Sequence, residues 1–378
     1  ATLLENLGNP FRLAVSPDGQ TLYASDAVSN YVYFIDLAAQ QLDTIDLGKS
    51  VAKIAISPDG RRLYVANSLD GSVSVVDTNT RGILATIGVI GTPEDMGFSP
   101  DGQSLYVANY SDDSVAVIST ATNRVTRSIP VAGSPTAVAI GPDGRLWVAS
   151  EVLNRVTVID TAAGDAASTI PVGRGPGGIT IAADGSRVYV ANNFDNSVSV
   201  IETATESVVA TIGVGSGPTE VVVTPDGRLV YAVNGFSDSV SVIDATELSV
   251  ATTAPVGSLP VGIVLTADGA TAYVANLSSL TELGNDARGL TVRTTGTVRF
   301  EAADATVDPL RELIVEAGKQ IGPPGGLVTL ESTGEVSLAV NDAGYLQADG
   351  TVIQFGGNPV HYQSMIDQGW TAVAADVI

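Results

Sequence analysis

Short runs of strand-like sequence fill the chain up to about residue 276. The run Ser-Val-Ser-Val-Ile-Asp at 239–244 alternates polar and apolar residues, and the apolar run Leu-Val-Tyr-Ala-Val-Asn at 229–234 precedes it. A period of two places successive side chains on opposite faces of a β-strand. Turns of the form Pro-Asp-Gly join many runs, because Pro presets φ and Gly accepts a positive φ. The pattern predicts short antiparallel strands.

The turn recurs at a nearly constant spacing, five times as Pro-Asp-Gly and twice as Ala-Asp-Gly. Its aspartates are Asp18, Asp59, Asp101, Asp143, Asp184, Asp226 and Asp268, which lie 41 or 42 residues apart. Each full repeat holds four strand-like runs, as at 217–258. Such a repeat is typical of a propeller blade, whose apolar faces are covered only by neighbouring blades. We predict an all-β, seven-bladed β-propeller with four-stranded antiparallel blades.

The first residues suggest how the ring closes. Residues 1–4 precede Pro10 much as residues 210–212 precede Pro218, so they resemble an outer strand without a blade of its own. We expect this N-terminal strand to complete the last blade, beside strands at 261–265 and 271–276. Strands from both ends would then close one blade and remove free edges.

The repeat pattern breaks after Asn276. Residues 289–293 are either a delayed third strand of the last blade or the start of a new domain. The run 290–300 resembles 328–338, which lies 38 residues later. We therefore assign the propeller to 1–285 and a smaller β-rich C-terminal module to 286–378. Whether the first strand of this module is shared with the last blade stays open.

One stretch carries a resemblance to a known family. Leu-Tyr-Val-Ala-Asn at 63–67, followed by the runs 72–77 and 84–87, resembles the YVTN-type β-propeller repeat over roughly residues 1–276. The first repeat departs from the motif with Ser25 and Asp26, and the fourth with Trp147 and Ser150. The resemblance implies an exported, surface-layer-like scaffold at the cell surface or outside the cell. It supplies no shared set of catalytic residues.

Charge and composition exclude several classes of partner. The formal net charge is −23, from 18 Lys and Arg against 41 Asp and Glu, so the surface repels phosphates and anionic lipid. Cysteine is absent and His361 is the only histidine, which removes thiolate sites and histidine-rich metal sites within one chain. No apolar run is long enough to span a membrane. We expect no nucleic-acid partner, no membrane insertion, no metal and no cofactor.

The predicted inner strands bring one group of charged residues to the ring axis. Arg12, Lys53, Asp95 and Glu220 stand at equivalent strand starts, so they share one level of the channel mouth. Such a mouth either binds a small ligand or ion, or holds mutually neutralising charges that lock the blades; we favour the second reading.

A second group lies in the loops that follow the second strands. Tyr110, Phe194 and Phe236 recur at similar blade positions, so they should cluster on one face of the ring. That face would contact a protein or a glycan, or the aromatic ring of each side chain would pack over its own hairpin.

Together these observations favour a non-enzymatic, exported structural or interaction protein used in cell-surface or extracellular assembly. Its partners would be further copies of itself, or other cell-surface proteins and glycans. Self-assembly through terminal strands would involve the following residues: Ala1, Leu3, Leu4, Trp370, Val373, Val377 and Ile378. The alternatives are a glycan- or peptide-binding propeller and a lactonase- or lyase-like enzyme with its site at the channel mouth.

Overall fold

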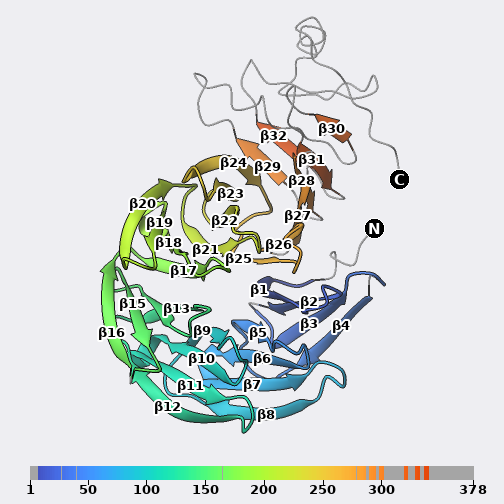
Figure 1. The fold of residues 1–378 in the computed structure, drawn as a ribbon. Helices are drawn as coiled ribbons and strands as arrows, with labels where there is room; N and C mark the ends of the chain where they lie inside the picture. Colours follow the sequence, from blue (N-terminus) through green and yellow to red (C-terminus); the bar gives the residue numbers. More distant parts are fainter. Residues whose placement is uncertain are drawn as a thin grey trace, which may run out of the picture.

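The computed structural model describes residues 7–26, 28–39, 41–163, 165–277, 279–286, 289–294, 298–301, 319–321, 328–332 and 336–339. Seven blades, each of four antiparallel strands, stand around a central axis (Figure 1). Six blades are separate four-stranded sheets, and the sheet of the seventh continues into two further strands. The predicted seven-bladed, all-β propeller is therefore confirmed. No helix of these residues is long and apolar enough to cross a membrane.

Within each blade the strands follow one another from the axis outward. Blade 1 holds β1 (Pro10–Val15), β2 (Thr21–Asp26), β3 (Tyr31–Asp36) and β4 (Gln41–Asp46). Blade 2 holds β5 (Ile54–Ile56), β6 (Arg62–Asn67), β7 (Ser72–Asp77) and β8 (Ile83–Gly88). Blade 3 holds β9 (Pro93–Phe98), β10 (Ser104–Asn109), β11 (Ser114–Ser119) and β12 (Arg124–Pro130). Blade 4 holds β13 (Pro135–Ile140), β14 (Leu146–Ser150), β15 (Arg155–Asp160) and β16 (Ala166–Pro171).

The remaining three blades repeat this order. Blade 5 holds β17 (Pro176–Ile181), β18 (Arg187–Asn192), β19 (Ser197–Glu202) and β20 (Ser207–Gly213). Blade 6 holds β21 (Pro218–Val223), β22 (Leu229–Asn234), β23 (Ser239–Asp244) and β24 (Ser249–Pro255). Blade 7 holds β25 (Gly262–Leu265), β26 (Thr271–Asn276), β27 (Ser279–Asp286) and β28 (Gly289–Thr294).

Local polar contacts set the two hairpins of a blade. In the Pro-Asp-Gly turn of blade 2, Asp59 Oδ1 accepts hydrogen bonds from Ser57 Oγ at 2.6 Å and Arg61 N at 3.1 Å, and Gly60 has a φ of 70°. At the other end of β6, buried Asn67 Nδ2 donates to Ser72 Oγ and Ser74 Oγ at 3.1 and 2.9 Å. Asn192 and Asn234 make the same pair of contacts in their own blades.

The apolar core lies in layers between adjacent blades. One layer packs Tyr64 and Val73 of blade 2 against Leu105 and Val107 of blade 3, all buried. Each blade therefore depends on its neighbours to cover its faces, as expected for a propeller.

The predicted closing strand is wrong, because β28 occupies the outer position of blade 7 beside β27. Residues 1–4 lie outside the described residues. Blade 7 meets blade 1 by side-chain packing, because Leu13 and Leu22 of blade 1 form one buried cluster with Tyr273 and Leu280 of blade 7.

The third strand of blade 7 also differs from the prediction. It is β27, which starts soon after β26, and residues 289–294 form the fourth strand. Strand β27 buries one leucine on each face, Leu280 in the cluster shared with blade 1 and Leu283 in the cluster shared with blade 6. Its residues no longer match the Ser-Val-Ser-Val sequence of the other blades.

Beyond blade 7 the described strands form two parallel pairs and one antiparallel pair. The parallel pairs are β28 with β31 (Val328–Ser332) and β29 (Val298–Glu301) with β32 (Val336–Ala339), and the antiparallel pair is β30 (Lys319–Ile321) with β31. Thr291 lies opposite Thr329 and Val298 opposite Val336, so both parallel pairs are offset by the same 38 residues as the repeated sequence.

Candidate functional site

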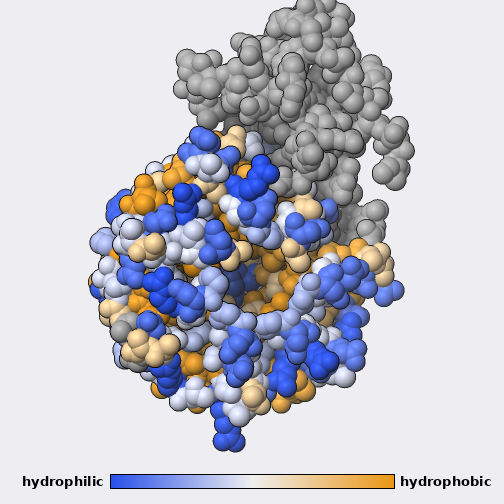
Figure 2. All heavy atoms as spheres, in the orientation of Figure 1, coloured by the Kyte–Doolittle hydropathy of each residue, from blue (hydrophilic) through white to orange (hydrophobic). Residues whose placement is uncertain are grey.

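The four charged residues placed at the ring axis from the sequence lie together. Arg12, Lys53, Asp95 and Glu220 all line one cavity of about 240 Å³, which we call the channel mouth. Figure 2 shows the hollow at the centre of the ring. Each residue stands in or just before an innermost strand, so the repeat itself brings them to one level.

Lys53 is the central cation of this group. Its Nζ lies 2.7 Å from Glu220 Oε1 and 3.2 Å from Asp95 Oδ1. The second oxygen of each carboxylate accepts a backbone N–H from the following blade, from Val138 at 2.9 Å and from Ile263 at 3.0 Å. These contacts join blades 2, 3, 4, 6 and 7, which is the blade-locking arrangement.

Arg12 connects the two blades at the ring seam. Its guanidinium donates to the carbonyl oxygen of Val261, just before β25, and its Cζ lies 4.5 Å from the centre of the Phe11 ring. The contact holds blade 1 against blade 7 beside the mouth.

The pairing shifts the ionisation of the mouth. Burial by itself lowers the pKa of Lys53, but the charges of Asp95 and Glu220 outweigh it, so this pKa is raised. Burial by itself raises the pKa of Glu220, but Lys53, Arg12 and the hydrogen bond from Ile263 hold this pKa below its usual value. Both groups are therefore charged over the neutral range.

Two further carboxylates at the mouth were not singled out from the sequence as site residues. Glu94 and Glu151 line the same cavity, and neither forms an ion pair with another described residue. Burial raises the pKa of Glu94. A hydrogen bond to Glu151 raises the pKa of Tyr110, so Tyr110 contacts a residue of the mouth without lining the cavity.

The second-to-third-strand loops carry a repeated apolar feature around this mouth. At the second position after β2, β6, β14, β18 and β22 stands an exposed apolar side chain. These residues, which we call the apolar crown, are Val28, Leu69, Val152, Phe194 and Phe236, with exposed fractions of 78, 86, 62, 59 and 71%. Equivalent loops of a propeller lie on one face, so the crown forms an interrupted apolar ring.

Phe194 and Phe236 lie over glycines of the preceding loop. A Cβ on Gly175 would meet the Phe194 ring at 2.5 Å, and one on Gly217 would meet the Phe236 ring at 2.4 Å. Each aromatic ring thus packs against its own blade with one face and exposes the rest.

Sequence reasoning missed three crown residues and misplaced one. It searched the loops for aromatics, so it selected Tyr110, which stands one position too early and contacts Glu151. Counting two positions from the buried polar residue that ends each second strand would have found Val28, Leu69 and Val152.

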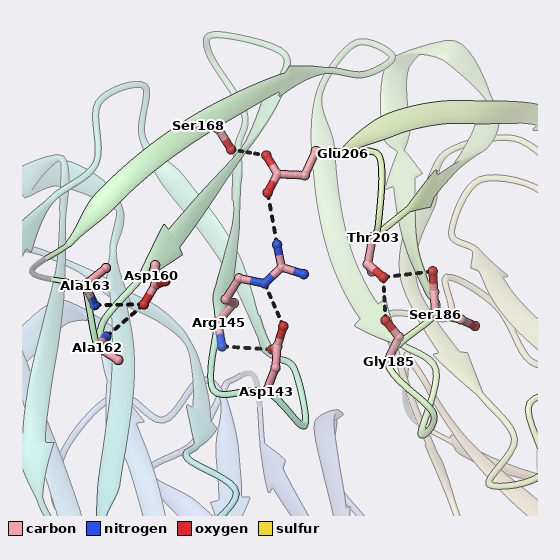
Figure 3. Close-up of polar contacts among 10 residues, drawn as sticks. All are labelled: Asp143, Arg145, Asp160, Ala162, Ala163, Ser168, Gly185, Ser186, Thr203 and Glu206. Atoms are coloured by element: carbon pink, nitrogen blue, oxygen red, sulfur yellow. Dashed lines mark hydrogen bonds and ion pairs between the residues drawn. The ribbon is translucent and has the colours of Figure 1, made fainter.

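Polar contacts between blades also occur on the opposite face (Figure 3). Arg145 of blade 4 contacts Asp143 at 2.6 Å and Glu206 of blade 5 at 2.9 Å, and Ser168 donates to the other Glu206 oxygen. Arg62 and Arg187 similarly donate to backbone oxygens of the next blade. These residues hold adjacent blades together.

No group of three His, Cys, Asp or Glu residues suited to a metal ion occurs in the described ranges. His361 lies outside them. So do the proposed assembly residues Ala1, Leu3, Leu4, Trp370, Val373, Val377 and Ile378.

Comparisons with known proteins concern the ring. The family model described as "Lactonase, 7-bladed beta-propeller" matches residues 1–90, 39–139 and 141–247. The chain is similar to a structure titled Kuenenia stuttgartiensis hydrazine synthase, with 25% identity, a TM-score of 0.68 and coverage of 74% of this chain and 96% of that one. No curated protein matches the chain.

Two more distant structures share the fold. A functionally unknown protein from Desulfotomaculum acetoxidans is 19% identical, with a TM-score of 0.63 and coverage of 70% of this chain and 92% of that one. Virginiamycin B lyase from Staphylococcus aureus is 16% identical, with a TM-score of 0.64 and coverage of 73% and 94%.

Proposed function

The chain belongs to the lactonase family of seven-bladed β-propellers, and we propose that it uses this ring to bind a partner protein rather than to catalyse a reaction. The apolar crown carries the proposal. Five blades expose a large apolar side chain at one equivalent loop position, each by 59% or more. Clustered exposed apolar groups mark interaction surfaces, because water disfavours them unless a partner covers them.

The central charges support a non-catalytic role. Lys53 is held by two carboxylates, and both of these also accept backbone N–H groups. A general acid, base or nucleophile needs a free proton site or lone pair near the substrate. The proton sites of Lys53 and the lone pairs of Glu220 are instead engaged in the contacts that hold the blades together.

Two features of the sequence support the proposed setting of this binding. The YVTN-type resemblance supports an exported scaffold at the cell surface or outside the cell. The acidic charge of −23 favours protein or glycan partners over nucleic acid and anionic membranes. Terminal-strand self-assembly remains part of the proposal, through residues outside the described ranges.

A random-peptide display selection tests the crown directly. Immobilised wild-type chain should enrich peptides that the double variant Phe194→Ser/Phe236→Ser binds about tenfold more weakly or worse, since hot-spot aromatics contribute about 2 kcal/mol or more each. The matched control is Leu84→Ser/Val209→Ser, two exposed apolar residues of outer strands. No enrichment, or equal loss in the control, would refute the proposal.

One observation favours lactone hydrolysis as a second candidate. Glu94 lines the mouth with Arg12, and its burial-raised pKa suits a proton donor. The family description names lactonases. Assaying aliphatic lactones with wild type and Glu94→Gln decides the matter, since turnover that Glu94→Gln abolishes would replace the binding proposal.

A further inference from the structure

We infer that the channel mouth receives a single Lys or Arg side chain from a partner segment whose apolar residues lie on the crown. The inference rests on the proposed binding function and names its partner as a cationic, apolar-flanked segment. It is carried by the continuity of mouth and crown, by the charge of the mouth and by a buried carboxylate oxygen that pairs with Lys53 alone.

Mouth and crown form one continuous surface. Glu151 and Asn193 line the mouth, and each directly precedes a crown residue, Val152 and Phe194. Gly175, which supports the Phe194 ring, lines the mouth as well. A segment that covers the crown therefore passes over the opening.

The mouth has an excess of negative charge. Four carboxylates line it, those of Glu94, Asp95, Glu151 and Glu220, against the two cations Arg12 and Lys53. Lys53 is shared by Asp95 and Glu220, and Arg12 donates to a backbone oxygen. Glu94 and Glu151 form no ion pair with another described residue, although Arg12 acts on Glu94 through its charge and Tyr110 hydrogen-bonds Glu151, so a cation is the complementary ligand.

Asp95 offers a further acceptor to the same ligand. This residue is 8% exposed, and its Oδ1 pairs with Lys53 Nζ at 3.2 Å and accepts no other hydrogen bond in the described part of the chain. A carboxylate oxygen can accept two hydrogen bonds, so an ammonium or guanidinium group that enters the mouth can share this oxygen with Lys53.

The surrounding loops disfavour anions. Asp112, Asp113 and Asp238 stand in them. The loop cations Lys49 and Arg174 are already paired with Asp70 and Asp195, at 3.4 and 2.7 Å. The cavity of about 240 Å³ lies below the roughly 300–1,000 Å³ of small-molecule pockets, so it suits one side chain whose backbone stays outside.

Three matched peptides test the inference on the full chain. The probes are fluorescein-labelled Gly-Leu-Phe-Lys-Phe-Leu-Gly and the same sequence with Gln or Glu in place of Lys. In fluorescence anisotropy, the Lys peptide should bind about tenfold more tightly than the Gln peptide, the Glu peptide should bind most weakly, and added salt should narrow these differences.

Variants separate the mouth from the crown. Glu94→Gln/Glu151→Gln should remove the preference for Lys while keeping the affinity for the Gln peptide. Phe194→Ser/Phe236→Ser should weaken all three peptides alike. Glu247→Gln, in the turn before β24 on the opposite face, should change nothing. Thermal unfolding checks the fold of each variant, and single Glu151→Gln, which should halve the preference or more, replaces the double variant if that one unfolds.

The outcomes distinguish the inference from the function it rests on. Equal affinity for the Lys and Gln peptides, with loss in the crown variant, overturns the cationic side chain and leaves the binding function standing. A Lys preference that survives in Glu94→Gln/Glu151→Gln overturns the assigned site. Binding of none of the peptides overturns the inference, and the display selection then judges the binding function alone.

Discussion

Lys53 shows how one side chain stabilises a closed ring. Its ammonium contacts Asp95 of blade 3 and Glu220 of blade 6, and these carboxylates bind backbone N–H groups of blades 4 and 7. A buried ion pair contributes little relative to an apolar replacement of the whole group, but removing one partner leaves the other charge uncompensated. The cation therefore matters more for what its loss would expose than for its own attraction.

Lys53→Met should lower the free energy of unfolding at neutral pH by about 3 kcal/mol, because two buried carboxylates lose their cation. The lowered pKa of Glu220 stabilises the wild type above the unfolded-state pKa, and this stability is lost as pH falls through the folded-state pKa. The difference between the two proteins should therefore shrink toward acid pH in urea unfolding. Lys49→Met, in an exposed pair, should cost less than about 1 kcal/mol.

A difference that stays constant from neutral to acid pH would show that Lys53 acts through packing alone.

Gly178 lies at a close approach between two inner strands. A Cβ there would lie 2.7 Å from Glu220 Cα and 3.0 Å from the Thr219 carbonyl oxygen, both backbone atoms of the next blade. Gly178→Ala should therefore destabilise the ring by about 1–3 kcal/mol. Gly213→Ala, where a Cβ meets nothing within 4 Å, should be neutral or slightly stabilising in the same thermal unfolding measurement. Equal effects would contradict the close-approach argument.

At the residue scale, a repeat alignment predicts the height of a side chain along the channel axis, but it does not predict which side chain this residue contacts across the channel. Aligning blade starts placed Lys53 and Glu220 at one height, since that follows from the 41- and 42-residue spacing. That Lys53 pairs across the channel with Glu220 depends on the channel width and side-chain length, which no repeat alignment contains. The crown needed a positional count instead of a search by residue type.

At the scale of elements, the alternation of polar and apolar residues predicts the strands well, but it does not predict their order in the last blade. The sequence leaves 289–293 as either a third strand or the start of a new domain, because β27 lacks the repeated Ser-Val-Ser-Val sequence. The structure shows that Leu280 and Leu283 still give each face of β27 a buried apolar residue. The position of a strand within the blade depends on which segment of the chain pairs with β26, and the repeated sequence does not determine this. The 38-residue similarity was visible in the sequence, but its parallel pairing was not, because similar hairpins pair in either direction.

A pair of cysteines tests this pairing, since the chain has none of its own. Val292 lies opposite Leu330 in the parallel ladder of β28 and β31. Adjacent strands are about 4.8 Å apart, within the Cα separations that disulfides accept. Val292→Cys/Leu330→Cys should oxidise to one intrachain disulfide, seen as a gel shift or by mass spectrometry of a digest. Val292→Cys/Val328→Cys, two residues out of register, should oxidise far less, and comparable oxidation of both pairs would refute the register.

At the scale of the molecule, the ring closes without a shared strand in the described part of the chain. Blades 7 and 1 meet through a buried apolar cluster and the Arg12 contact to Val261. The other interfaces have similar clusters but also a continuous chain crossing them. In the described part of the chain, blades 7 and 1 can therefore separate without stretching a chain segment that joins them, unlike any other pair of neighbouring blades.

Leu280 tests the weakness of the seam, because it is fully buried in the seam cluster with Leu13 and Leu22. Leu280→Ala should lower the unfolding free energy by about 2–5 kcal/mol. It should also speed hydrogen exchange first in β1 and β26, because blades at a seam separate without unfolding the rest. Leu105→Ala, an equal deletion between blades 2 and 3, should cost similar stability without that local effect. Uniform acceleration around the ring in Leu280→Ala would mean that the propeller opens as one cooperative unit.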